Sequence, residues 1–256
     1  MKILVCVKQV PDTTEIKWTE NNTMQREGVE SIINPYDLYA VDCALNIKKQ
    51  VPDTEIIVIS MGPLQAMDII RKAIALGCDK GVLLSDKKFA GADTYATGKT
   101  IASAIKTKFD DFDLIICGQF AIDGDTAQTG PSIASQLNIP QVTFVEEVSK
   151  VDEKCLYVLR KIEEGVETLK VEYPALICVL KTDKETTRPT INGIKNAQNS
   201  VIDVLSIDDI NLEEAGIKAS PTYVSKAFRP ENKRGECVFV KSAEDMALQI
   251  KELLNE

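Results

Sequence analysis

The sequence predicts an α/β fold with a doubly wound, mostly parallel sheet, an antiparallel extension and a C-terminal arm. Short continuous apolar runs recur up to Cys117, and a helical pattern follows each of them, as in parallel strands joined by crossover helices. After Pro140, short strand-like runs follow one another without helices between them, which indicates antiparallel pairing. We therefore expect an α/β domain over residues 1–185 and an arm over residues 186–256.

The parallel strands are expected where the apolar runs are continuous, because such strands are buried on both faces. These runs lie within residues 1–8, 55–60, 81–84 and 114–117. Helices are expected after a turn at residues 34–37 and over residues 64–74, 91–105 and 133–137, with Gly77 ending the second of them. Residues 10–29 are polar and predict a surface excursion or hairpin.

The second half is expected to begin with four short strands, at residues 141–148, 155–160, 166–171 and 175–180, in an antiparallel extension. Beyond Lys181 the sequence is polar and predicts irregular structure. Residues 242–254 predict a last helix with Ala243, Met246, Ile250 and Leu253 on one apolar stripe. We expect this helix to pack on its own domain, and docking on a partner chain is the alternative.

Composition excludes several classes of function. The net charge of −9 argues against a nucleic-acid partner, and no apolar run is long enough for membrane insertion. The chain has no histidine, so we exclude serine–histidine, cysteine–histidine and zinc chemistry. Its seven cysteines form no CxxC pair and are expected to be reduced, as in a cytoplasmic protein.

The loop after the fourth predicted strand has the composition of an anion-binding site. Residues 117–131 read CGQFAIDGDTAQTGP, and a helical pattern follows. Backbone N–H groups and the helix dipole favour negative charge where a helix begins after a parallel strand. Gly118, Gly124 and Gly130 allow close approach of the backbone to a ligand. The alternative is a tight turn in which Asp125 or Thr126 caps the helix.

Ligands of doubly wound sheets bind beyond the carboxyl ends of the strands, near the point where strand order reverses. Five segments of small and polar residues are expected there, at residues 6–10, 34–37, 61–62, 93–97 and 118–129. A shared nucleotide pocket is the simplest interpretation of five such segments.

Two other motifs are weak. Gly98-Lys99-Thr100 resembles the end of a P-loop, but Asp93 stands where glycine is required, and the lysine would lie inside the helix. Asp123 and Asp125 alone are poor support for a divalent metal site, and a role in shaping the turn or contacting a ribose is preferred.

Two segments of the second half carry a specific resemblance. Residues 158–169 read VLRKIEEGVETL and residues 173–178 read YPALIC, which together resemble the signature of the electron transfer flavoprotein beta subunit. The opening VCVKQV, the Asn34-Pro35 turn, SMGP at residues 60–63 and the loop at residues 119–130 follow in the family's order. The resemblance thus covers essentially the whole chain.

The resemblance implies an adenine nucleotide alpha hydrolase-like fold and pairing with an alpha subunit that carries a redox-active FAD. It also implies an adenine-nucleotide pocket in the beta subunit itself. By position, the pocket residues correspond to Cys6, Asn34, Pro35, Tyr36, Asp37, Met61, Gly118, Gln119, Phe120, Ala121, Ile122, Asp123, Gly124, Asp125, Thr126, Ala127, Gln128 and Thr129. An apolar anchor for partner dehydrogenases corresponds to Ile191, although this stretch also fits an ordinary linker.

Family members differ in what fills this pocket. Housekeeping members hold AMP as a structural ligand, whereas electron-bifurcating members hold a second FAD that accepts a hydride from NADH. Thr94 and Thr97, together with the form of the loop at residues 123–128, resemble the bifurcating branch. Their hydroxyls can bond phosphate or flavin atoms that AMP lacks. The alternative is that Asp93 or Thr94 merely caps its helix.

The resemblance to the bifurcating branch implies a set of partners. One electron would pass to the alpha-subunit FAD and on to an acyl-CoA dehydrogenase-type partner, and the other to ferredoxin or flavodoxin. A housekeeping carrier with AMP, passing electrons without NADH oxidation, is the closest rival. A stand-alone adenine-nucleotide-binding module of the stress-protein type is more distant, because the antiparallel extension and the signature count against it.

Overall fold

The computed structural model describes residues 1–12, 31–223, 225, 239–240 and 242–254. Most of the hairpin predicted at residues 10–29 lies outside these ranges, as does Cys237. The two ends of that excursion are described: β2 (Gln9–Pro11) pairs antiparallel with β3 (Ser31–Ile33).

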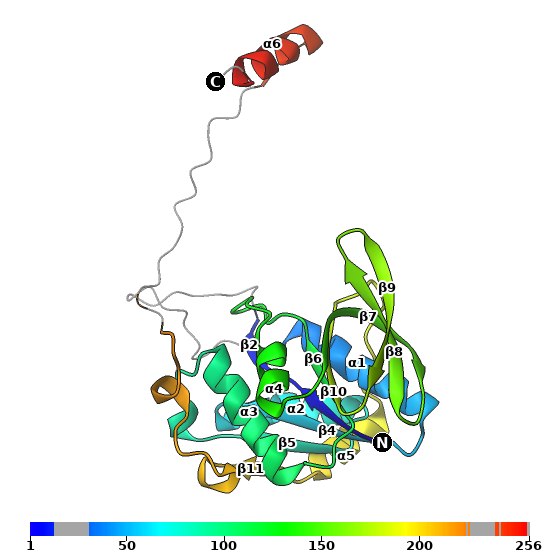
Figure 1. Ribbon diagram of the computed structural model, residues 1–256, viewed down its shortest axis with the longest axis vertical. Coiled ribbons are helices and arrows are strands. Elements are labelled where there is room, and N and C mark those ends of the chain that lie inside the picture. The colour runs from blue at the N-terminus through cyan, green and yellow to red at the C-terminus, as the bar shows by residue number, and fades with distance from the viewer. Residues whose placement is uncertain (13–30, 224, 226–238, 241, 255–256) are drawn as a thin grey trace.

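Within these ranges, nine strands form one sheet in the order β11-β5-β4-β1-β6-β10-β7-β8-β9, and β11 and β9 are its two edges (Figure 1). Neighbours from β11 to β7 run parallel, and β7, β8 and β9 pair antiparallel. The strands are β1 (Lys2–Cys6), β4 (Glu55–Met61), β5 (Lys80–Leu84), β6 (Leu114–Gly118), β7 (Gln141–Val151), β8 (Cys155–Ile162), β9 (Gly165–Glu172), β10 (Ala175–Val179) and β11 (Ile202–Leu205).

Helices cover both faces of the sheet (Figure 1). Successive strand residues point to opposite faces, so Ile3 and Val5 join the core under α1 and α2, whereas Leu4 joins the core under α3 and α4. This arrangement confirms the doubly wound, mostly parallel sheet. The helices are α1 (Pro35–Gln50), α2 (Met67–Leu76), α3 (Thr94–Lys108), α4 (Thr129–Leu137), α5 (Ile191–Asn199) and α6 (Ala243–Leu253), with short 3-10 turns η2 (Leu64–Ala66), η3 (Lys87–Phe89), η4 (Asp208–Ile210) and η5 (Gly216–Lys218).

The predicted antiparallel extension is confirmed for β7, β8 and β9 but is wrong for β10. Strand β10 lies between β6 and β7 and is parallel to both. All five residues of β10 are buried, as expected for a parallel strand covered on both faces. The β8–β9 hairpin therefore leads the chain back into the parallel part of the sheet.

The expectation of irregular structure beyond Lys181 is wrong at two places. Helix α5 packs against α2, where Arg71 donates from Nη1 to the Ala197 carbonyl at 2.8 Å. Strand β11 then adds a parallel edge next to β5. The division into residues 1–185 and 186–256 stays a prediction, although these two elements of the second part pack on the first.

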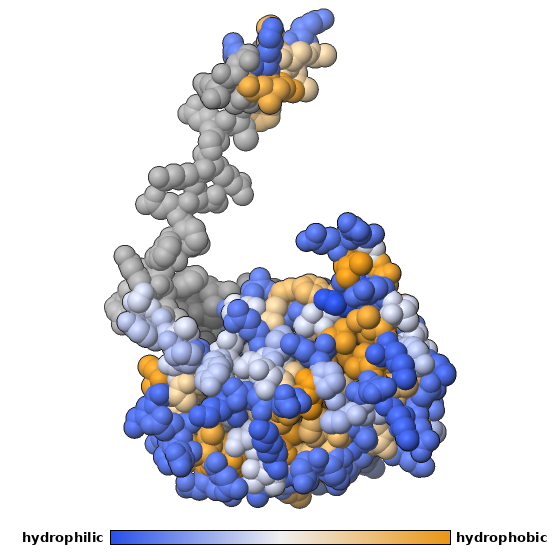
Figure 2. All heavy atoms as spheres, in the orientation of Figure 1, coloured by the Kyte–Doolittle hydropathy of each residue, from blue (hydrophilic) through white to orange (hydrophobic). Residues whose placement is uncertain are grey.

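Helix α6 forms where predicted, and Ser242 caps it by accepting from the Asp245 N–H at 3.1 Å. Packing on its own domain is not what the structure shows: Met246 and Ile250 are each 50% exposed. Figure 1 draws α6 apart from the sheet, and Figure 2 shows apolar atoms open to view on it. Among the residues that the structure describes, Met246 and Ile250 of the stripe therefore remain half exposed.

The six described cysteines are free thiols, in agreement with the expectation from their spacing. Cys6, Cys117 and Cys178 stand opposite one another on β1, β6 and β10. Hydrogen bonds with Cys178 and Cys6, together with burial, raise the pKa of Cys117 well above its usual value, so that it stays protonated. None of the helices described has the length and apolar character to cross a bilayer.

Candidate functional site

The strand order places the candidate site at the carboxyl ends of β1 and β6. The chain passes from β1 outward to β4 and β5, and α3 then returns it to β6 on the other side of β1. The order therefore reverses between β1 and β6, which is where doubly wound sheets bind their ligands. Cys6 ends β1 and Gly118 ends β6, so both lie at this point.

The loop that follows β6 is tied to the start of α1 by Asn34. This residue is the N-cap position of α1, with Pro35 in the first helical position, as proline prefers. Its side chain makes no cap bond. Instead Nδ2 donates to the Phe120 carbonyl at 2.7 Å, and Oδ1 accepts from the Ile122 N–H at 3.2 Å. Asn34 is fully buried, so its amide serves the protein's own backbone.

Asp37 is a buried carboxyl at the same junction, only 6% exposed. Its Oδ2 accepts from the Lys8 N–H at 2.7 Å. Burial raises the pKa of Asp37 from 3.8 to about 7, although hydrogen bonds from Asn34 and from the Lys8 and Gly118 N–H groups act in the opposite direction. This carboxyl thus connects the ends of β1 and β6 to α1.

The tip of the loop is held in an uncommon backbone shape. The N–H groups of Gly124 and Asp125 both donate to the Ala121 carbonyl, at 3.1 and 2.7 Å. Asp125 and Ala127 have φ of 49° and 55°, in the left-handed region that costs a non-glycine residue about 1 kcal/mol or more. The ammonium of Lys8 pairs with Asp123 at 2.6 Å. Such local strain is typical of functional loops.

Three aromatic rings line up along the first part of the loop. The Tyr36 and Phe120 ring centroids are 5.4 Å apart, and those of Phe120 and Phe144 are 6.3 Å apart, both edge to face. Gln119 is buried beside them, where its Oε1 accepts from the Phe144 N–H at 2.7 Å. The loop is therefore anchored to β7 on one side and to α1 on the other.

The starts of α3 and α4 lie next to each other. The Thr94 hydroxyl donates to Gln128 Oε1 at 3.2 Å, which joins the first residue of α3 to the residue before α4. A Cβ on Gly98 would lie 2.2 Å from the Ser132 hydroxyl, so glycine allows the two helices to approach closely. Asp93 caps α3 by accepting from the Ala96 N–H at 2.9 Å. This is the role that the alternative interpretation gave to Asp93.

The start of α4 differs from that of α3, because it has no side-chain cap. Its N-cap residue is Gln128, not Asp125 or Thr126 as the alternative interpretation expected. An uncapped helix start presents N–H groups and a positive dipole end to an anion. The space around Gly124 is also open, since a Cβ there would have no atom within 4 Å. These features fit the phosphates of a nucleotide.

The other two loop glycines are required by packing within the protein. A Cβ on Gly118 would lie 2.3 Å from Asp37 Oδ1 and 2.8 Å from the Tyr36 backbone carbon. A Cβ on Gly130 would lie 2.4 Å from the Cys178 sulfur. Gly118 and Gly130 therefore let the loop settle on α1 and β10, whereas a Cβ on the exposed Gly124 would meet no described atom within 4 Å.

The structure brings most of the predicted site residues together at the carboxyl ends of the parallel strands. Direct contacts join the 34–37 turn to the 118–129 loop, and that loop to the start of α3, where Thr97 lies in the first turn. Cys6 and Met61 end neighbouring strands and pack against the same core. Ile191 lies elsewhere, at the start of α5, with 84% of its surface exposed.

Two residues of this region were not singled out from the sequence. Lys8 follows the first strand, and its place in an expected lining segment was its only signal. Phe144 lies inside β7, where its φ of 59° and its ring contact with Phe120 have no counterpart in the sequence pattern. Contacts of this kind depend on which strands become neighbours.

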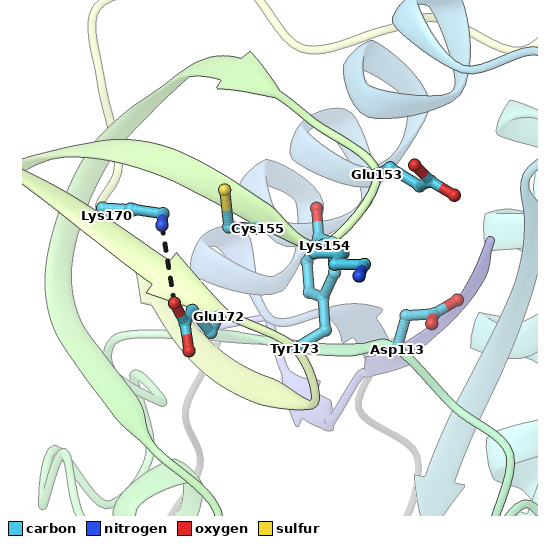
Figure 3. Close-up of a pocket in the computed structure, with 7 residues that line it drawn as sticks. All are labelled: Asp113, Glu153, Lys154, Cys155, Lys170, Glu172 and Tyr173. Atoms are coloured by element: carbon cyan, nitrogen blue, oxygen red, sulfur yellow. Dashed lines mark hydrogen bonds and ion pairs between the residues drawn. The ribbon is translucent and has the colours of Figure 1, made fainter.

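A separate cavity of about 430 Å³ lies at the other end of the strands (Figure 3). Its lining includes Asp113, which directly precedes β6, and residues of the β8–β9 hairpin, whose Lys170 and Glu172 are paired at 3.4 Å. The buried Tyr173 hydroxyl has no hydrogen-bond partner. The full lining is Asp113, Glu153, Lys154, Cys155, Lys170, Glu172 and Tyr173. None of these residues was predicted to bind the nucleotide.

Comparison with known proteins identifies the family. Residues 21–210 match the family model described as electron transfer flavoprotein domain. The caffeyl-CoA reductase-Etf complex subunit CarD of Acetobacterium woodii is 45% identical over 238 residues, covering 92% of this chain and 90% of that protein. The electron transfer flavoprotein subunit beta of Thermoanaerobacterium thermosaccharolyticum is 44% identical over 259 residues, covering 100% and 98%.

A further relative comes from another reductase system. The acryloyl-CoA reductase electron transfer subunit gamma of Anaerotignum propionicum is 40% identical over 242 residues, covering 91% of this chain and 90% of that protein. The similarity to these relatives extends over nearly the full length of each, and it confirms the resemblance found in the signature segments. This chain belongs to the electron transfer flavoprotein family, as a beta subunit.

Proposed function

We propose that this beta subunit binds FAD beyond the carboxyl ends of β1, β4 and β6 and takes part in electron bifurcation. When bound there, FAD would accept a hydride from NADH and pass its electrons on singly. The task of the chain is to bind and orient the cofactor. The carrying observation is the hydrogen bond from Thr94 to Gln128, which places the starts of α3 and α4 side by side.

The adjacent starts of α3 and α4 favour FAD over AMP as the ligand of the candidate site. AMP has one phosphate, for which the uncapped start of α4 is sufficient. FAD has a pyrophosphate and a flavin ring with further hydrogen-bonding atoms, and the hydroxyls of Thr94 and Thr97 in the first turn of α3 are suited to bond them. No acid–base side chain is needed for hydride transfer, which agrees with the absence of histidine.

The names of two relatives support the proposal of an electron-bifurcating role. One belongs to a caffeyl-CoA reductase-Etf complex and the other is an electron transfer subunit of an acryloyl-CoA reductase. By analogy we infer a heterodimer with an alpha subunit that carries its own FAD. An acyl-CoA dehydrogenase-type partner would receive one electron, and ferredoxin or flavodoxin the other.

The double variant Thr94→Val/Thr97→Val tests the role of the two hydroxyls in FAD binding. Each lost hydrogen bond is worth about 1 kcal/mol, so FAD affinity in the beta site should fall roughly tenfold or more. The measurement is FAD retained by the purified heterodimer after gel filtration, released by denaturation and quantified. Thr107→Val is the matched control, because Thr107 lies at the far end of α3 and bonds the Ser103 carbonyl.

Unchanged FAD content in the double variant would contradict the assignment of these hydroxyls. Loss of FAD in Thr107→Val as well would show that the helix, and not the two hydroxyls, is responsible. Far-ultraviolet circular dichroism of all three proteins separates these outcomes from misfolding.

A further inference from the structure

Asn34 and Asp37 are the two buried polar side chains at the start of α1, 0% and 6% exposed. Both ends of the Asn34 amide bond backbone groups of the loop after β6, at Phe120 and Ile122. A side chain whose donor and acceptor are both engaged in this way serves the loop's conformation. We therefore expect Asn34 to hold the loop in place and not to contact a ligand in the candidate site.

Asp37 makes the complementary connection. One carboxylate oxygen accepts from the Lys8 N–H beyond β1, and the Gly118 N–H at the end of β6 donates to the same group. The other oxygen lies so close to Gly118 that a Cβ there would be 2.3 Å away. One carboxyl thus holds the two strand ends that flank the point where the sheet order reverses.

We propose that Asn34 and Asp37 form a latch that positions the loop of residues 118–122 on the start of α1, and that cofactor retention depends on this latch being closed. They are positioning residues and do not touch the cofactor through these side chains. The second clause rests on the proposed function, because it takes the loop to be part of the cofactor site. The first clause holds for any occupant of that site.

The latch is linked to pH through Asp37. Burial raises its pKa to about 7 when the latch is closed, and an open latch returns the carboxyl to water and to its ordinary value near 3.8. The charged group that acts on Asp37 is Lys8, whose ammonium pairs with Asp123. Closing therefore takes up a proton between about pH 4 and pH 7. The closed state loses stability as pH rises through this window, by at most about tenfold per pH unit, and is constant above it.

Hydrogen exchange of the intact heterodimer tests the latch directly. Protection factors for peptides covering residues 118–122 are measured between pH 5.5 and 8.5, corrected for the intrinsic rate at each pH. In the unaltered protein, protection should fall as pH rises to about 7 and then level off. Asp37→Asn cannot titrate and should give a flat profile. Asn34→Leu removes both bonds to the loop, together with the bond to Asp37, and should speed exchange roughly tenfold or more at every pH.

The controls lie on the same helix. Asp42→Asn alters a half-buried carboxylate that accepts from the Thr187 N–H, and Asn46→Leu alters an exposed amide contacted by Lys49. Both should leave the protection of residues 118–122 unchanged. A sloped profile in Asp37→Asn, or unchanged protection in Asn34→Leu, would overturn the latch, and the profile of the unaltered protein tests it even if a variant fails to fold.

Cofactor content measured on the same samples separates the two proposals. Faster exchange with less bound nucleotide supports the latch whether that nucleotide is FAD or AMP. Faster exchange with full nucleotide content would overturn the dependence of retention on the latch. The identity of the released nucleotide, FAD or AMP, decides the proposed function independently of the loop's exchange.

Discussion

Gly118 is the residue on which the loop, α1 and β6 converge. Its hydrogen atom stands where a Cβ would meet Asp37 Oδ1 at 2.3 Å and the Tyr36 backbone at 2.8 Å. Neither the carboxyl nor the helix backbone can move away, because Asp37 is buried and bonded to Lys8. Glycine at this position is thus a packing requirement of the site's frame.

Gly118→Ala should therefore destabilise the protein by roughly 2–3 kcal/mol and loosen the loop, as expected for overpacking against backbone. Gly124→Ala is the matched control, since nothing lies within 4 Å of a Cβ there and its φ is not in the left-handed region. Urea unfolding of both variants measures the difference. Equal free energies of unfolding for the two would contradict the packing argument.

The sequence predicted which segments come together better than it predicted the contacts of each residue. The segments 34–37 and 118–129 do meet, because strand-end loops of a parallel sheet share one edge. That Asn34 bonds backbone groups, and that Gly118 faces Asp37, follows from packing between elements far apart in the chain. The composition of each segment does not predict such contacts.

Among the elements, β10 shows why strand direction is hard to predict. The hairpin β8–β9 precedes it, and a third antiparallel strand is the usual continuation of a hairpin. The run Ala175–Val179 is nevertheless continuously apolar, which is the signature of a parallel strand buried on both faces. That signal outweighs the hairpin context, because only a place between β6 and β7 buries all five residues.

Helix α5 was missed because polar residues dominate its sequence, and β11 was missed because it is only four residues long. Of its four residues only Ile202 is buried, as suits a strand at the edge of a sheet. Helix α5 rests on α2 through small residues: a Cβ on Gly193 would lie 2.1 Å from the Ala75 carbonyl oxygen, and Ala197 is buried. Gly193 and Ala197 face α2, and Ile191 on the same helix remains exposed.

An exposed Ile191 fits the proposed contact with a dehydrogenase. Ile191→Ala should change the free energy of unfolding by no more than about 0.5 kcal/mol, because 84% of the residue is exposed, yet slow electron transfer to the partner dehydrogenase several-fold. Val201→Ala is the matched control, with the same exposure just beyond α5. An equal loss of transfer in both variants, or none in Ile191→Ala, would refute a specific anchor.

For the molecule as a whole, two exposed regions fit a role in an assembly with other chains. The apolar stripe of α6 is half exposed, with Met246 and Ile250 at 50% (Figure 2). The candidate cofactor site lies beyond the carboxyl ends of β1 and β6, where Gly124 and Gln128 are exposed among the described residues. Both features fit the proposed pairing with an alpha subunit.

The proposed function requires that the pocket of this beta subunit hold a second FAD. The most direct measurement is to purify the chain together with its alpha subunit, release the ligands by denaturation and quantify FAD and AMP per heterodimer. We expect close to two FAD and no AMP per heterodimer. One FAD with one AMP would contradict the proposed function, and would make this pocket the structural nucleotide site of a housekeeping carrier.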